Sequence, residues 1–308
     1  MTGSDLLKRV HTPDLVERIG RTPLIPVRGL AGVPDGVDVL GKAEWFNPGG
    51  SVKDRAAWAM VADAERRGAL RGRTLLDATS GNTGIAYAWI GAARGHRVHL
   101  CLPANANAER RRLLAALGAT LTLTDAMDGT DGAIREARRL VAEQPERWCY
   151  PDQYANPENW RAHYRTTAEE IWSDTEGQVT HVVMGIGTSG TLVGTGRRLR
   201  ELNPAIRVIG VQPDSPYHAL EGLKHLPTAI VPPIYDAGVH HELMEVASEE
   251  AIDVVKRQAA RGLLLGWSAG AALVAAARVA RGLERGVIVA ILPDGAERYL
   301  SEPLWGEP

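Results

Sequence analysis

A regular alternation of short apolar runs with longer amphipathic segments constrains the fold more than any other feature. The apolar runs have the length of buried strands and lie at 74–78, 98–102, 119–123, 182–184, 208–211 and 287–292. Between most of them lie segments with helical spacing of apolar residues, at 85–93, 108–117, 132–142, 159–172 and 191–202. This pattern is typical of parallel sheets with helices on both faces, so the sequence predicts an α/β fold.

The remaining segments complete this outline. We expect a short helix at 14–19, an extended piece at 23–27, a strand at 37–43 and a long helix at 52–67. The polar stretch 150–159 contains two prolines and no periodicity, which suits a crossing between two lobes. Residues 213–246 form the longest irregular region, and a loop of this length is usually functional or mobile.

The composition limits the classes of binding partner that we expect. A chain of 308 residues can form one or two domains, and its net charge of -2 gives no global field for nucleic acid or an anionic membrane. Cys101 and Cys149 have no metal or disulfide spacing, which indicates no metal site and a reducing cytoplasm. The first 21 residues lack an apolar signal region and no apolar run is long enough to span a bilayer, so we expect a soluble, unprocessed protein.

The stretch 47–55, NPGGSVKDR, places a lysine at a helix start. Its Pro-Gly-Gly turn cannot continue a helix, and Ser51 with Asp54 has the spacing of a capping box. Lys53 therefore lies in the first helical turn, where the helix dipole favours a neutral amine. A neutral lysine amine can form a Schiff base, although a solvated lysine after a capped turn is the simpler alternative.

The loop 79–84, TSGNTG, joins a predicted strand to a predicted helix. Its backbone N–H groups converge at the positive end of that helix, and the side chains of Thr79, Ser80, Asn82 and Thr83 can reach the same point. This arrangement suits an anion, most simply a carboxylate. A polar turn without a ligand is the alternative.

The loop 185–191, GIGTSGT, also follows a strand and opens a helix. It contains a literal GxGxxG, but the acidic residue that a dinucleotide fold needs after the next strand is replaced by Gln212. The hydroxyls of Thr188, Ser189 and Thr191 instead favour a terminal phosphate.

The segment 266–270, GWSAG, matches the GxSxG pattern of hydrolases. Such a hydrolase needs a histidine later in the chain, and no histidine follows His241. Ser268 is therefore interpreted as a neutral hydroxyl at a helix start, either binding a ligand atom or capping the helix. The histidine pairs 96/99 and 240/241 lack a third ligand at metal spacing.

Taken together, NPGGSVKDR, TSGNTG, GIGTSGT and GWSAG in this order resemble the cysteine synthase and cystathionine β-synthase family of pyridoxal-phosphate enzymes. The resemblance covers nearly the whole chain and implies the tryptophan synthase β-like fold, called fold type II, with two lobes that each contain a mostly parallel twisted sheet flanked by helices. A smaller mobile lobe would span 41–147, and a larger lobe would comprise 1–40 and 148–308.

The resemblance also implies roles for individual residues. Lys53 would be the Schiff-base lysine, Asn82 would bond the ring hydroxyl of the cofactor, and Ser268 its ring nitrogen. The cofactor phosphate would be held by Gly187, Thr188, Ser189, Gly190 and Thr191. The substrate carboxylate would be held by Thr79, Ser80, Thr83 and Gln153. Ser189 stands where many relatives have glycine, and Trp267 where they often have a smaller aliphatic residue.

The implied reaction is β-substitution. An activated L-serine, O-acetylserine or O-phosphoserine, would lose its β-leaving group to an aminoacrylate, which adds a sulfur nucleophile to give L-cysteine. Alternatives within the fold are a cystathionine β-synthase-like or other β-substituted alanine synthase and a serine or threonine dehydratase. The missing acid disfavours a nicotinamide oxidoreductase, and the intact Lys53 disfavours a non-catalytic binding protein.

Two further expectations concern specificity and assembly. Lys224 lies where some relatives that accept O-phosphoserine place an arginine, so it is a candidate ligand for a substrate phosphate, with a solvated loop lysine as the alternative. The family and the eight tryptophans favour a two-fold homodimer.

Overall fold

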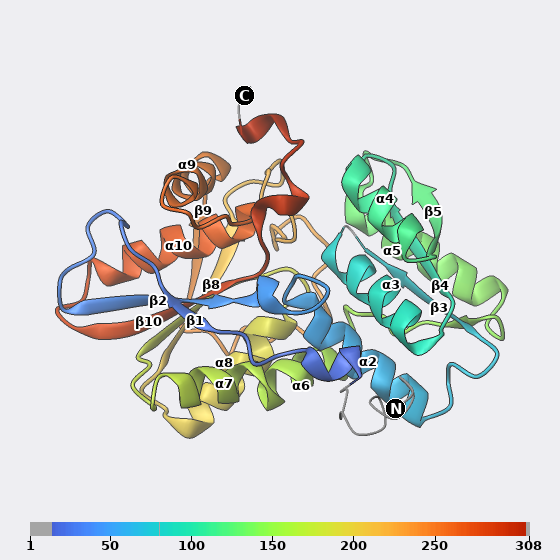
Figure 1. Cartoon of the computed structure of the whole chain (residues 1–308), viewed down its shortest axis with the longest axis horizontal. Coiled ribbons are helices and arrows are strands. Elements are labelled where there is room, and N and C mark those ends of the chain that lie inside the picture. The colour runs from blue at the N-terminus through green and yellow to red at the C-terminus, as the bar shows by residue number, and fades with distance from the viewer. Residues whose placement is uncertain (1–13, 80, 306–308) are drawn as a thin grey trace, which may run out of the picture.

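The computed structural model describes residues 14–79 and 81–305, and these form two lobes with one sheet each (Figure 1). Within these residues the larger sheet has six strands in the order β1-β2-β10-β7-β8-β9. Only β1 and β2 pair antiparallel, and all other neighbours pair parallel. The strands are β1 Leu24–Pro26, β2 Val37–Ala43, β10 Gly286–Leu292, β7 His181–Gly185, β8 Arg207–Pro213 and β9 Glu242–Val246.

The smaller sheet has the order β5-β4-β3-β6, and its strands pair parallel throughout. They are β5 Thr120–Thr124, β4 Val98–Pro103, β3 Thr74–Ala78 and β6 Trp148–Cys149. The predicted α/β fold with two mostly parallel sheets is therefore confirmed.

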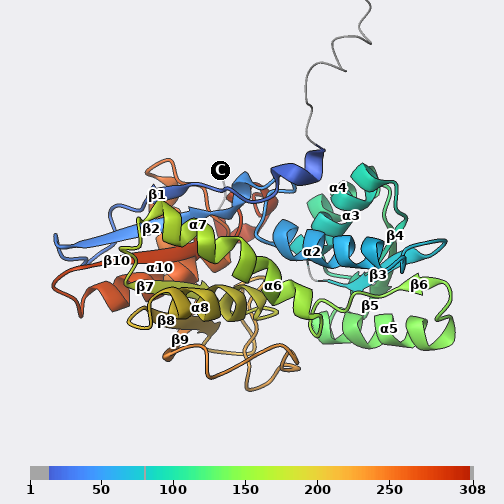
Figure 2. The same cartoon turned by 90° about the horizontal axis from the view of Figure 1, so that it is seen from below.

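Helices cover both faces of each sheet, because the strands are apolar on both sides. On the larger sheet they are α6 Pro157–Arg165, α7 Thr167–Asp174, α8 Gly190–Leu202, α9 Ser248–Ala259 and α10 Trp267–Ala280. On the smaller lobe they are α2 Lys53–Arg66, α3 Asn82–Arg94, α4 Ala108–Ala116 and α5 Gly129–Glu143. Figure 2 shows α3 and α4 on one face of the smaller sheet and α5 on the other.

Four clusters of buried apolar side chains correspond to these four faces. In the larger lobe, one cluster joins α10 and α9 to the sheet, and another joins α7 and α8 to its opposite face. In the smaller lobe, α2, α3 and α4 pack on one side and α5 on the other. The short 3-10 helices are η1 Leu15–Arg18, η2 Glu44–Phe46, η3 Ala296–Arg298 and η4 Pro303–Trp305, and side chains of η1, η2 and η4 pack in or against these clusters.

The predicted helix 159–172 is wrong as a single element. Two helices, α6 and α7, meet at Thr166, whose backbone leaves the helical region at φ -128° and ψ -68°. The Thr166 hydroxyl donates to the carbonyl of Ala162 at 2.7 Å and accepts from the Arg55 guanidinium at 3.1 Å. Side-chain bonding of this kind to the preceding turn bends helices, and Arg55 fixes the bend from another element.

The irregular region is shorter than predicted. Residues 214–241 carry no helix or strand, but β9 follows at once and pairs parallel with β8 at the edge of the larger sheet.

The strand pairing places the lobe limits at other residues than the predicted 41 and 147. All of β2 pairs with β10 in the larger sheet, and β6 pairs with β3 in the smaller one.

The segment 150–156 runs from β6 of the smaller sheet to α6, which packs on α8 of the larger lobe. Among the described residues, no helix has the length and apolar character needed to cross a bilayer.

Candidate active site

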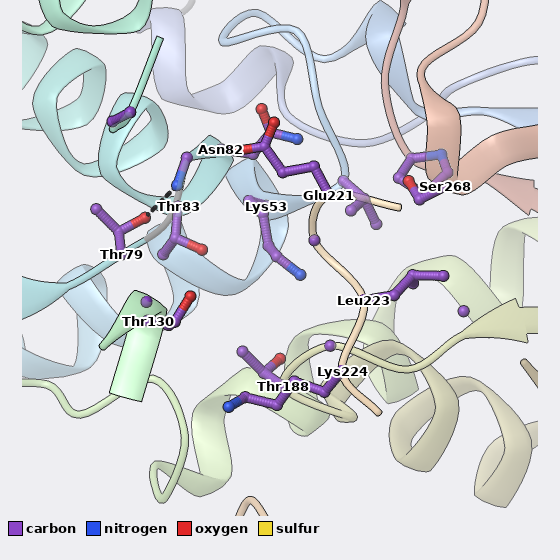
Figure 3. A pocket seen from close by; sticks show the side chains of 18 of the residues that line it. Lys53, Thr79, Asn82, Thr83, Thr130, Thr188, Glu221, Leu223, Lys224 and Ser268 are labelled. Carbon is purple, nitrogen blue, oxygen red and sulfur yellow. Dashed lines mark hydrogen bonds between the residues drawn. The ribbon is translucent and has the colours of Figure 1, made fainter. Parts of the chain in front are cut away.

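A cavity of about 500 Å³ lies between the two lobes, and all four sequence motifs contribute to its lining. Two of the motifs follow β3 and β7 directly, at the carboxyl ends of parallel strands, where ligands bind in open α/β sheets. Predicted site residues in the lining are Lys53, Thr79, Asn82, Thr83, Gln153, Gly187, Thr188, Thr191, Lys224 and Ser268. Figure 3 shows the Lys53 side chain between Thr79 and Thr83 on one side and Ser268 on the other. Ser80 lies outside the described residues.

Lys53 begins α2, as predicted, and its side chain is partly buried and lines the cavity. Burial lowers the pKa of this amine from 10.5 to about 8, against the negative charge of Asp294, which raises it. The main cause is therefore removal from water, which the sequence could not reveal.

The predicted capping box is wrong. The hydroxyl of Ser51 accepts from the N–H of Lys53 at 3.3 Å, but the Asp54 carboxylate accepts from the N–H of Gly49 at 2.5 Å and not from Ser51. The tight turn 47–50, closed by the bond from the N–H of Gly50 to the carbonyl of Asn47 at 2.8 Å, places the N–H of Gly49 on that carboxylate.

The loop expected to hold a carboxylate is ordered by its own hydroxyls. Thr79 accepts from the N–H groups of Gly81 and Gly84, both at 3.0 Å, and thereby starts α3. The Thr83 hydroxyl donates to the side-chain carbonyl of Gln153 at 2.8 Å. Gln153, 70 residues away in sequence, in turn donates to the carbonyl of Ala78 at 2.6 Å. The structure thus brings Thr79, Thr83 and Gln153 to one wall of the cavity.

The loop expected to hold a phosphate lies at the start of α8. Ser189 has a left-handed backbone with φ 69°, and its buried hydroxyl has no hydrogen-bond partner in the described chain. Thr188 accepts from the amide of Asn159 at 3.0 Å, and Thr191 lies 3.3 Å from the buried ring of His163. The backbone at Gly187 comes so close to another loop that an added Cβ would overlap the carbonyl oxygen of Gly222.

Ser268 is buried in the first turn of α10 and lines the cavity, as predicted for a helix-start hydroxyl. Its neighbour Trp267 packs on Trp305 with ring centroids 4.9 Å apart and donates to Glu302 at 2.7 Å. The bulky residue at 267 is therefore accommodated by the C-terminal segment.

Within residues 14–79 and 81–305, ion pairs join the two lobes at the cavity. Lys224 donates to Asp131 of α5 at 2.9 Å, so its ammonium group already has a carboxylate partner. Arg110 of α4 pairs with Glu221, and its guanidinium lies 5.3 Å from the centroid of the Tyr299 ring.

A model of the family described as pyridoxal-phosphate dependent enzyme matches residues 15–294. The chain belongs to this family. It is 48% identical over 301 residues to a cysteine synthase of Aquifex aeolicus, covering 95% of this chain and 92% of that protein. A crystal structure of a cysteine synthase of Entamoeba histolytica superposes with a TM-score of 0.90 at 34% identity, covering 98% and 93% of the two chains. The crystal structure of an O-acetylserine dependent cystathionine β-synthase of Helicobacter pylori superposes with a TM-score of 0.89 at 33% identity, covering 96% of this chain and 99% of that chain.

These findings confirm the resemblance stated from the sequence and the cofactor it implied. The described residues also fit pyridoxal phosphate on their own chemistry. The Lys53 amine, partly shielded from water in the cavity, can hold its aldehyde, and Gly187, Thr188 and Thr191, which line the cavity beside the start of α8, suit its phosphate. Ser189 and Gly190 belong to the same loop but are not part of the lining described for the cavity.

Sequence reasoning missed several residues that contact the predicted ones, among them Asp294, Arg298 and Asn159. Asp294 accepts from the side-chain amide of Asn82 at 2.6 Å, and Arg298 donates to the other end of the same amide. Asn159 joins the segment of Gln153 to the loop 185–191 by donating to the backbone carbonyl of Gln153 at 2.6 Å and to the Thr188 hydroxyl. Asp294 follows the apolar run 287–292, so its position after a predicted strand was a usable signal.

Proposed function

We propose that this enzyme forms L-cysteine by pyridoxal-phosphate dependent β-substitution on an activated L-serine with a sulfur nucleophile. The observation that carries the proposal is the Lys53 amine, with its pKa near 8, in a cavity that it shares with two anion loops. One loop suits a carboxylate and the other a phosphate, as an amino-acid substrate and this cofactor require. The relatives described above, which are cysteine-forming or use O-acetylserine, support the same reaction.

Each residue of the site would have a separate role. Lys53 would hold the cofactor and, once freed, would take the α-proton of the substrate at Nζ. When bound, pyridoxal phosphate supplies an electron sink for the pair left by that proton. Asn82 and Ser268 would orient the cofactor ring. The phosphate would be held by Gly187, Thr188, Ser189, Gly190 and Thr191, and the substrate carboxylate by Thr79, Ser80, Thr83 and Gln153.

The neutral hydroxyl of Ser268 favours elimination over transamination. A serine opposite the ring nitrogen cannot supply a negative charge to keep that nitrogen protonated, so the electron sink is weaker than one paired with aspartate. Closure of the smaller lobe over the bound carboxylate would exclude water from the reacting atoms. We propose that the chain segments that connect the two sheets act as the hinge of this movement.

The test is a substrate panel on the purified, cofactor-saturated chain. O-acetylserine, O-phosphoserine and serine are each combined with sulfide, thiosulfate and homocysteine, and the amino-acid products are identified. We expect cysteine from an activated serine and sulfide, and no product from Lys53→Ala, whose helix start tolerates alanine. Cystathionine as the main product would favour the β-synthase alternative, and ammonia with a keto acid would favour the dehydratase.

For the leaving group, we propose that Lys224 lets the enzyme accept O-phosphoserine. Lys224 lines the cavity, and its bond to Asp131 holds its ammonium group at the smaller lobe. A charge-assisted contact contributes about 1.5–3 kcal/mol, so Lys224→Ala should lower kcat/KM for O-phosphoserine roughly ten- to a hundredfold. O-acetylserine turnover should change little. Equal losses on both substrates would reject this role.

We further propose a two-fold homodimer that works in the cytoplasm. The two cysteines are free and buried, in keeping with a reducing compartment. The tryptophan count gives the dimer no support, because all eight lie within or against the four core clusters. Phe46, with 60% of its surface exposed, is an apolar side chain that a partner could cover. Sedimentation as a monomer would contradict the dimer.

A further inference from the structure

Asp294 occupies a junction between three of the motif loops. The carbonyl of Pro293 accepts from the N–H of Val52 at 2.9 Å, and Asp294 itself forms an isolated β-bridge with Ser51. The carbonyl of Asp294 accepts from Gly266 at 3.1 Å, at the start of the GWSAG loop. One short segment after β10 is therefore attached to both the lysine turn and the Ser268 loop.

The side chain of Asp294 reaches the third loop. Its Oδ2 accepts from the Asn82 amide at 2.6 Å and from the Tyr299 hydroxyl at 2.5 Å, which is the acceptor role of an ionised carboxylate. Its Oδ1 is buried and has no hydrogen-bond partner in the described chain. Asp294 is fully buried, so its charge acts on its neighbours with little screening by water.

We propose that Asp294 is a positioning residue of the active site, whose carboxylate orients Asn82 and supplies the negative charge that stabilises the protonated Lys53 amine. The proposal rests on the proposed function, in which Nζ of Lys53 takes and holds the α-proton of the substrate. A partly buried ammonium ion needs a nearby anion, and Asp294 is attached by its backbone to the turn that carries this amine.

Other charged groups around this pair act differently. The groups that face Asp294 and Lys53 from neighbouring elements are Arg298, Tyr299, Arg110, Asp54 and His163. The two guanidinium groups are positive and act on the Tyr299 hydroxyl, whose pKa they lower against its burial. Burial raises the pKa of Tyr299 well above 10 and lowers that of His163 well below 6.5, so both are neutral. Burial also raises the pKa of Asp54 to about 7, but the charge that acts on Lys53 is that of Asp294.

Asp294→Asn tests the charge, because asparagine keeps the size and can still accept from Asn82. In the full chain freed of cofactor, Lys53 is acetylated with trace reagent between pH 6 and 10, and the Lys53 peptide is quantified by mass spectrometry. The parent should show a midpoint at about pH 8. Removing a nearby opposite charge should lower the midpoint in Asp294→Asn by about one unit.

A merely structural role for Asp294 predicts the opposite sign. A loosened site admits water, which relieves the burial that depresses the Lys53 pKa, so the midpoint would rise. Asp54→Asn is the matched control, since it removes a buried carboxylate of the same turn and should not lower the midpoint. A midpoint in Asp294→Asn that is unchanged or raised would overturn the proposal.

The cofactor-loaded enzyme gives a second measurement. With a weaker base at Lys53, Asp294→Asn should lower kcat roughly three- to tenfold and leave KM for O-acetylserine within about twofold. A raised KM with unchanged kcat would contradict the proposal. If the parent shows no β-substitution, the proposed function fails, while the acetylation midpoints still decide the role of Asp294.

If Asp294→Asn fails to fold, Tyr299→Phe tests the proposal instead. Phenylalanine removes one of the two donors to Oδ2 and keeps the charge, so the carboxylate attracts the Lys53 proton more strongly. The midpoint should then rise by a few tenths of a unit with no faster hydrogen exchange in the turn 47–53, whereas a loosened site would raise both. An unchanged or lowered midpoint in this variant would overturn the proposal.

Discussion

Replacing Ser189 by glycine should stabilise the cofactor-free chain and weaken cofactor binding at the same time. Ser189 has φ 69°, a left-handed conformation that costs a residue with a Cβ about 1–2 kcal/mol. Glycine removes this cost but loses about 0.5–1 kcal/mol through the added freedom of the unfolded chain.

Ser189→Ala separates these contributions, because alanine removes the hydroxyl and keeps the Cβ in the left-handed conformation. The difference between the two variants should be about 0.5–1 kcal/mol in favour of glycine. For a chain of 308 residues, 1 kcal/mol shifts the melting temperature by about 1.5 °C, so the glycine variant should melt about 1 °C above the alanine variant in calorimetry. A glycine variant that melts at or below the alanine variant would refute the strain argument.

Cofactor affinity should change in the other direction. A hydrogen bond to a charged phosphate contributes about 1.5–3 kcal/mol, so both variants should bind pyridoxal phosphate roughly ten- to a hundredfold more weakly in equilibrium dialysis. Binding as tight as in the parent would show that the Ser189 hydroxyl does not reach the phosphate.

Three further predictions concern the phosphate loop and the buried ion network. Thr191→Ala should raise the Kd for the cofactor roughly tenfold and change kcat at cofactor saturation less, since it would contact the phosphate and not the reacting carbon; the reverse pattern would mean the loop is misassigned. Gly187→Ala should cost about 1–3 kcal/mol of stability and impair cofactor binding, because its Cβ would overlap the Gly222 carbonyl oxygen. Gly282→Ala is its control, with a Cβ 3.5 Å from the Val279 oxygen, and equal melting temperatures would refute the prediction. Burial alone would raise the pKa of Glu170, but the hydrogen bonds and charge of Arg55 and the charge of Lys42 hold it at about 2. Ionised Glu170 therefore contributes stability above pH 4.5 that is lost as the pH falls toward 2, worth about 2 kcal/mol after allowance for partial exposure. Glu170→Gln should lack this loss in urea unfolding between pH 6 and 2, and the same pH dependence in both chains would contradict it.

The strands were predictable from sequence because most are buried on both faces. The runs predicted at 74–78 and 37–43 coincide with β3 and β2, whose residues are mostly buried. β9 was missed because it lies at the sheet edge, where two of its five residues, Glu242 and Glu245, are exposed. The break between α6 and α7 depends on Arg55, more than a hundred residues away, and no local pattern reveals it.

The site was predictable where residues follow strands and unpredictable where long-range contacts decide. Thr79, Thr83 and Thr188 lie in loops after β3 and β7, and the structure places them on one cavity. The same rule applied to the end of β10 would have found Asp294. By contrast, the bond of Lys224 to Asp131 joins residues 93 positions apart, and the Lys53 pKa depends on burial that only the folded chain creates.

The position of the cofactor on the chain tests the account most directly. The purified enzyme is reduced with borohydride, digested, and searched by mass spectrometry for the peptide that carries the pyridoxyl group. The group should lie on Lys53, in the peptide that follows the Pro-Gly-Gly turn, with loss of the visible absorbance. A pyridoxyl group on another lysine, or none on a chain that still forms cysteine, would contradict the central role of Lys53.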